Sequence, residues 1–199
     1  RNPRSSSEPD WFALGGLLID RDKEESAKQL IAQFRERWPE MGNEPFRSYD
    51  IRCKTGRFRW LADASAQRKQ AFYEELTALI VTLPMHVIAC VVDRPGYNKR
   101  YMTQYGQRRW RLCRTAFGIV VERAAKVAVH HNARLRVFAE RSDKPTETQF
   151  KEYYEKMRSE GLPFNPQNSM QYRPLSAETF QRTLLEFRIK TKDSALMQF

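Results

Sequence analysis

The sequence contains few residues of the kinds that build metal centres or disulfide-linked folds. There are three cysteines and three histidines in 199 residues. Cys53, Cys90 and Cys113 are odd in number, lie far apart and form no C-x-x-C pair, which argues against a disulfide framework and a zinc knuckle. No histidine spacing of the H-E-x-x-H type occurs. The simplest interpretation is a set of reduced thiols in a cytoplasmic protein.

Several enzyme signatures and long apolar runs are also missing. The chain has no Ser-centred nucleophile elbow and no G-x-x-x-x-G-K-[ST] loop, which argues against hydrolase triads and nucleoside triphosphatases. Its first residues, "RNPRSSSEPD", are polar and lack the apolar core of a signal peptide. No apolar stretch is long enough to cross a bilayer. We therefore expect no membrane partner.

Positive charge is what the sequence has in excess. Lys and Arg number 35 against 24 Asp and Glu, which gives a net charge of +11. Such a balance favours an anionic partner, with nucleic acid ahead of a membrane surface. Hydrophobic residues make up 41% of the chain, enough for a real core. We expect one domain over residues 1–199, with residues 1–10 as a polar lead-in.

Apolar runs typical of buried strands alternate with segments of helical spacing. Strands are predicted at residues 11–20, 86–93 and 134–139 and around 185–189. Helices are predicted from the stripes Ala27–Trp38, Phe72–Leu83 and Phe150–Met157 and over about residues 107–130. Strands mixed with helices of ten or more residues predict an α/β fold.

Three shorter segments have a less regular pattern. Residues 45–61 alternate polar and apolar side chains around Lys54-Thr55-Gly56, which predicts a hairpin or an exposed strand with a turn. Asp93 is interpreted as a turn residue before Pro95-Gly96, which breaks the strand of residues 86–93. A short strand is expected within residues 168–176.

Four stretches of the chain resemble one bacterial protein family. They are "FALGGLLID", "SYDIRCKTGRFRWL", "HVIACVVDR" and "LRVFAERSDKPTETQF". Together they are similar to the family known as domain of unknown function 3800, and the similarity covers most of the chain. The resemblance implies a ribonuclease H-like fold, in which a central mixed sheet has helices on both faces.

The same resemblance implies an acidic site built from three places. These are a first strand that begins with Asp-Glu-Ser-Gly, an acid that ends the fourth strand, and an Asp inside a late helix. Glu140 matches the second. The first strand and the late Asp have no counterpart in residues 1–199, so we expect the sequence to be a portion of a longer chain, incomplete at both ends.

Glu140 is therefore the candidate catalytic residue and metal ligand, and Asp143 could assist it. Two-metal nucleases hold Mg²⁺ or Mn²⁺ with several carboxylates, because hard cations prefer oxygen ligands. The alternative is structural for both residues. Glu140 would be a solvated strand end, and Asp143 an acid at the start of a helix near Pro145.

Candidate nucleic-acid contacts lie in two other segments. Residues 95–111 interleave arginines with aromatic residues, which suits phosphates and stacked bases, and the candidates there are Tyr105, Arg108, Arg109 and Arg111. The alternative is a solvated loop and first helical turn whose aromatics pack on the core. Lys190 and Lys192 are further candidates for phosphate contact, against the alternative of solvated lysines at a strand end.

Taken together, the residues and the resemblance predict a ribonuclease H-like protein that acts on nucleic acid. In its complete form we expect a nuclease that depends on Mg²⁺ or Mn²⁺. The alternative is a non-catalytic module that binds nucleic acid or another protein, in a bacterial defence or toxin-related system. A metal ion beside Glu140 would favour the enzyme.

Overall fold

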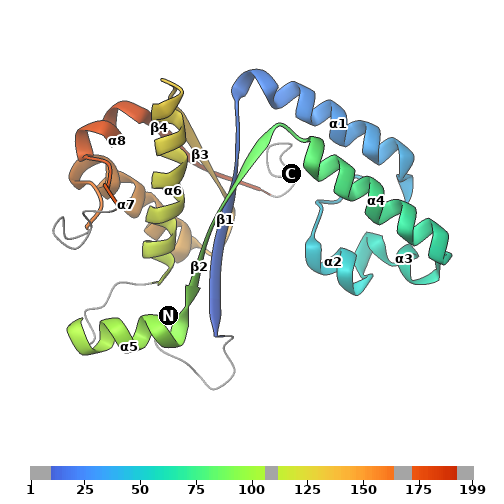
Figure 1. The fold of residues 1–199 in the computed structure, drawn as a ribbon, viewed down its shortest axis with the longest axis horizontal. Coiled ribbons are helices and arrows are strands. Elements are labelled where there is room, and N and C mark those ends of the chain that lie inside the picture. The colour runs from blue at the N-terminus through green and yellow to red at the C-terminus, as the bar shows by residue number, and fades with distance from the viewer. Residues whose placement is uncertain (1–9, 106–111, 164–171, 192–199) are drawn as a thin grey trace. The chain divides into compact units, whose positions relative to one another are not determined.

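A computed structural model describes residues 10–105, 112–163 and 172–191, without the side chains of residues 103–105 (Figure 1). The helices and strands, in chain order, are β1 (Trp11–Ile19), α1 (Glu24–Arg37), α2 (Ser48–Cys53), α3 (Trp60–Asp63), α4 (Ala66–Thr82), β2 (Met85–Asp93), α5 (Arg94–Tyr105), α6 (Leu112–His130), β3 (Leu135–Glu140), α7 (Lys144–Glu160), α8 (Ala177–Thr183) and β4 (Leu184–Lys190). Short 3₁₀ turns are η1 (Arg21–Lys23), η2 (Pro39–Met41) and η3 (Gly56–Phe58).

The strands pair as two small sheets, β1 with β2 and β3 with β4. Each strand falls where the apolar runs predicted one, and α1, α4, α6 and α7 fall on the predicted helical stripes. The described part of the chain is thus a mixed α/β structure, as predicted.

The described residues form two compact units. Unit 1 contains residues 10–16 and 87–189, and unit 2 contains residues 17–86 and 190–191, each without the segments that the structure does not describe. The prediction of a single domain stays a prediction.

Unit 2 is built around an aromatic core. Phe34 on α1 and Phe72 on α4 are fully buried, and their ring centroids lie 5.8 Å apart. Trp38 stacks on Trp60 with a centroid distance of 5.5 Å, and both rings meet Phe72 edge-on. Such pairs add specific geometry to the free energy of apolar burial. The stripe from Ala27 to Trp38 is core, as its spacing predicted.

The prediction of a hairpin over residues 45–61 is wrong. These residues form α2, η3 and α3, and the turn at Lys54-Thr55-Gly56 joins helices instead of strands. The residues that face the core are Ile51, Phe58 and Leu61, each 6% exposed or less. Their spacing is helical, and burial against the aromatic core outweighs the local alternation of polar and apolar residues.

In unit 1, helix α6 is the central packing element. Phe117 on α6 stacks on Phe150 of α7 at 4.9 Å and meets Phe187 of β4 edge-on at 5.9 Å. Gly16 in β1 faces the same helix, because a Cβ built on it would lie 3.6 Å from a methyl group of Val120. One helix thus packs against a strand of each sheet.

Two other predictions in this unit need correction. The strand β2 ends at Asp93 as expected, but Asp93 is a helix cap instead of a turn residue, because it accepts a hydrogen bond from the backbone N–H of Gly96 at 2.9 Å and α5 begins at Arg94. The expected strand within residues 168–176 is not seen at residues 172–176, which form a turn and irregular backbone. Residues 168–171 lie outside the described part.

Candidate functional site

Glu140 lies at the end of a βαβ unit. It is the last residue of β3, its side chain is exposed, and the chain returns through α7 and α8 to the neighbouring strand β4. Near the start of both strands, Arg136 of β3 lies 3.4 Å from Glu186 of β4, which fits parallel pairing, and parallel strands end at the same edge of their sheet. The last residue of β4 is Lys190, which the sequence marks as a candidate for phosphate contact.

Asp143 is the N-cap of α7. One oxygen of its carboxylate accepts the backbone N–H of Thr146 at 3.0 Å, and the other accepts the hydroxyls of Thr146 at 2.8 Å and Ser142 at 3.3 Å. These hydrogen bonds, above all the one from the backbone amide of Thr146, lower the pKa of Asp143. The geometry fits the structural alternative for this acid, a helix N-terminal residue.

Glu147 fixes the loop between Glu140 and α7. Its carboxylate accepts the backbone N–H of Ser142 at 3.1 Å and lies 3.9 Å from Nε of Arg141. The sequence reasoning missed this residue. The signal that marks it is an acid in the first turn of a helix, where it can reach back to an unpaired N–H group.

The described residues alone do not form a divalent metal site. No three His, Cys, Asp or Glu side chains are grouped for an ion within residues 10–105, 112–163 and 172–191. Glu140 has the oxygen donors that Mg²⁺ or Mn²⁺ prefers, but both carboxylate oxygens of Asp143 are engaged at the helix start. The assignment of Glu140 as catalytic residue and metal ligand stays a prediction.

Most of the predicted nucleic-acid contacts lie outside the described residues. This applies to Arg108, Arg109, Arg111 and Lys192, and Tyr105 is described only as the last backbone position of α5.

The described tyrosines of the same segment pack within unit 1. The rings of Tyr97 and Tyr101 are 4.7 Å apart, and the hydroxyl of Tyr97 lies 3.4 Å from that of Thr115 on α6. Both side chains are half-buried, and a role for this segment in nucleic-acid contact stays a prediction.

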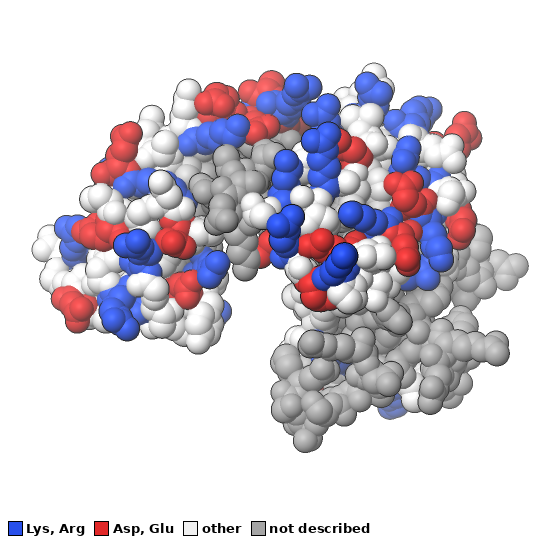
Figure 2. Space-filling model, turned by 180° about the vertical axis from the view of Figure 1, so that it is seen from behind, with Lys and Arg blue, Asp and Glu red and all other residues white. Residues whose placement is uncertain are grey.

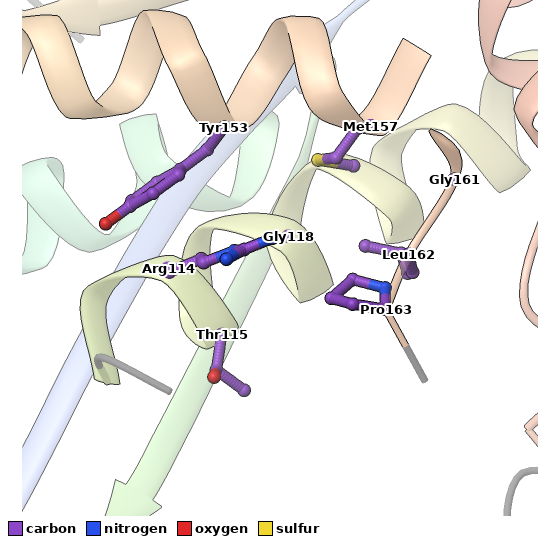
Figure 3. Close-up of a pocket in the computed structure, with 8 residues that line it drawn as sticks. All are labelled: Arg114, Thr115, Gly118, Tyr153, Met157, Gly161, Leu162 and Pro163. Atoms are coloured by element: carbon purple, nitrogen blue, oxygen red, sulfur yellow. The ribbon is translucent and has the colours of Figure 1, made fainter. Parts of the chain in front are cut away.

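A small pocket lies between α6 and α7 (Figure 3). Its lining residues are Arg114, Thr115, Gly118, Tyr153, Met157, Gly161, Leu162 and Pro163. The guanidinium of Arg114 lies 5.4 Å from the ring centroid of Tyr153, and a Cβ on Gly118 would lie 3.1 Å from Leu162. The volume is about 20 Å³, room for about one water molecule. This pocket is too small for a substrate.

The comparisons with known proteins place the chain among relatives. The uncharacterized protein y4pM of Sinorhizobium fredii is 30% identical to it over 191 residues, which are 94% of this chain and 68% of that protein. The chain belongs to the y4pM family. No family model matches the sequence, and no solved structure matches it. In the described part of this chain, no helix is both long and apolar enough to cross a membrane.

Proposed function

We propose that the protein is ribonuclease H-like and acts on nucleic acid as a metal-dependent nuclease, with Glu140 as one ligand of Mg²⁺ or Mn²⁺. The observation that supports this most is the position of Glu140. It ends β3 at the edge where the strands of a βαβ unit finish, ahead of a loop that Glu147 holds on α7. Ligand sites of open α/β sheets gather at such edges.

The pairing of the strands supports the ribonuclease H-like part of the proposal. In that fold the first strand is central and lies between the second and the fourth. The pairs β1–β2 and β3–β4 are those that such a sheet has on either side of its central strand. A strand between β1 and β3 would satisfy the backbone N–H and C=O groups along both inner edges.

The net charge of +11 supports an anionic substrate. Because Glu140 alone cannot hold an ion, the remaining carboxylate ligands would come from residues that the structure does not describe.

The test compares the parent protein with Glu140→Gln and with Asp143→Asn. Gln keeps the size of the side chain and removes the charge that would hold the ion. Asn keeps an oxygen for the N–H of Thr146, so α7 stays capped. The loss of an outer partner of a metal ligand typically lowers activity about 10–100-fold. We expect Glu140→Gln to lower the rate of cleavage of single- or double-stranded DNA or RNA by more than that. Asp143→Asn should cleave like the parent.

Thermal melting of all three proteins provides the folding control. A Glu140→Gln variant that cleaves like the parent would rule out the role of Glu140. A parent protein that cleaves none of the four substrates with Mg²⁺ or Mn²⁺ would rule out the nuclease.

A non-catalytic nucleic-acid-binding module is the second candidate. It is favoured by the lack of a group of three acids among the described residues and by the use of Asp143 as a helix cap. Binding of nucleic acid without metal-dependent cleavage would support it.

A further inference from the structure

Unit 2 carries a strongly basic segment over residues 47–69. Its positive residues are Arg47, Arg52, Lys54, Arg57, Arg59, Arg68 and Lys69, and its acids are Asp50 and Asp63. Elsewhere in residues 17–86 the acids outnumber the bases. On the face that Figure 2 shows, Lys and Arg are interspersed with Asp and Glu. Whether a cation is available to a ligand thus depends on its own neighbours.

Four of the seven cations already have partners. Arg47 lies 3.9 Å from Asp50, and Arg52 donates to the carbonyl of Ser48 at 3.3 Å. Arg68 pairs with Glu40 and lies over the rings of Trp38 and Trp60, and Lys69 donates to the carbonyl of Ala62 at 3.1 Å.

Lys54, Arg57 and Arg59 differ from the other four. All three are exposed, and none makes a side-chain hydrogen bond or ion pair with another residue in the described part of the chain. They follow one another within the turn of residues 54–59. A ligand that binds there would not have to displace an existing ion pair.

The turn of residues 54–59 has a fixed backbone. The hydroxyl of Thr55 donates to the carboxylate of Asp50 at 2.8 Å, and its N–H donates to the carbonyl of Asp50 at 3.0 Å. Phe58, between Arg57 and Arg59, is 1% exposed and anchors the turn in the aromatic core. A fixed backbone reduces the conformational entropy that binding costs.

An exposed aromatic side chain lies on the adjoining helix. Tyr49 on α2 is 66% exposed, and α2 leads directly into the turn of residues 54–59. Proteins bind single-stranded nucleic acids with phosphate-binding cations and exposed aromatic rings, through backbone charge and base stacking.

We propose that Lys54, Arg57, Arg59 and Tyr49 form a binding surface for single-stranded nucleic acid in unit 2. The three cations contact phosphates and Tyr49 stacks on a base. This surface does not depend on Glu140 or on cleavage.

The first test replaces Lys54, Arg57 and Arg59 together by Gln in the whole protein. Binding of labelled single-stranded DNA and RNA is followed by fluorescence anisotropy with a chelator present, between about 50 and 200 mM salt. Each phosphate contact contributes about 0.7 to the slope of log K against log salt for a single strand, so three lost contacts lower the slope by about 2. We expect at least a tenfold loss of affinity at the lower salt concentration.

The matched control replaces Lys151, Lys156 and Arg182 by Gln. These exposed cations of α7 and α8 also have no ion pair within the described residues, and the change in net charge is the same. The control should bind nearly like the parent. An equal loss in both triple variants would mean that only net charge matters and would overturn the proposal, as would no loss in either.

The second test concerns Tyr49. Tyr49→Ala should weaken single-strand binding by roughly 5- to 150-fold and Tyr49→Phe should restore it, because stacking needs only the ring. If Tyr49→Ala bound single strands as tightly as the parent, Tyr49 would not be part of the binding surface.

Vesicles of an anionic phospholipid provide the third measurement. If the triple Gln variant loses vesicle binding but keeps its affinity for nucleic acid, the surface binds membranes and the proposal is wrong. All variants should melt at the temperature of the parent, since the replaced side chains are exposed.

Discussion

Replacing Glu122 should detach one segment of unit 1 from helix α6 and lower the free energy of unfolding. Glu122 on α6 is fully buried, although it lies on an otherwise apolar face with Phe117, Val121 and Ala125. Its carboxylate accepts the hydroxyl of Tyr172 and the backbone N–H of Leu175, the latter at 2.8 Å.

Lys126 completes this group. Its ammonium lies 3.5 Å from Glu122, donates to the carbonyl of Tyr172 at 3.0 Å and sits 4.4 Å from the centroid of the Tyr172 ring. Burial, together with the hydrogen bond to Glu122, raises the pKa of Tyr172, so the hydroxyl remains a donor at neutral pH.

Glu122→Leu leaves two donors and one cation without their acceptor. The side chain of Lys126 is 25% exposed and can be hydrated, so the cost comes mainly from the two orphaned donors, at about 1–3 kcal/mol each. A total loss of about 2–6 kcal/mol is a large share of the roughly 5–15 kcal/mol that stabilises a domain. Glu122→Gln should cost less, because its amide can still accept from Leu175 and donate to the oxygen of Tyr172.

Urea unfolding measures these free energies, and hydrogen exchange at the amide of Leu175 reports on the segment itself. A double-mutant cycle with Tyr172→Phe should give a coupling of about 0.5–3 kcal/mol. If Glu122→Leu lost less than about 1 kcal/mol, or showed no coupling to Tyr172, the reasoning would be refuted.

Two further changes test other parts of the account. Tyr154 is 1% exposed and its hydroxyl has no partner in the described residues, so Tyr154→Phe should gain about 1 kcal/mol in urea unfolding. Burial raises the pKa of Tyr154 to about 12, above the roughly 10 of an unfolded chain. The unfolded chain therefore ionises this hydroxyl before the folded chain does, so the parent loses stability between about pH 10 and 12, and the Phe variant should lose less over that range. Lys54 has a left-handed backbone (φ 56°), so Lys54→Gly should raise the free energy of unfolding by up to about 1 kcal/mol while it weakens nucleic-acid binding; a destabilised variant would contradict this.

Most helices and strands could be predicted because the spacing of apolar residues within each one indicates its type. Continuous apolar runs gave the strands, and the 3.6-residue stripes gave α1, α4, α6 and α7. Residues 45–61 show where local pattern fails. Tyr49, Ile51 and Cys53 alternate as in a strand, but the buried positions Ile51, Phe58 and Leu61 pack in the aromatic core of unit 2, which includes Phe72 farther along the chain.

The candidate site shows the same limit. Whether Asp143 binds a metal or caps α7 depends on the direction of its carboxylate, which spacing does not reveal. Glu122 went unnoticed because its partners, Tyr172 and Leu175, come from a segment about fifty residues later. The clue was a charged residue on a buried helix face, since such a group has to find a partner when the chain folds.

The most direct test of the proposed function is the binding of Mn²⁺, followed by titration calorimetry on the parent protein, Glu140→Gln and Asp143→Asn. If Glu140 is a ligand, the parent and Asp143→Asn bind Mn²⁺, and Glu140→Gln loses this binding while it melts at an unchanged temperature. Equal Mn²⁺ binding by Glu140→Gln and the parent, or no Mn²⁺ binding by the parent, would contradict the account.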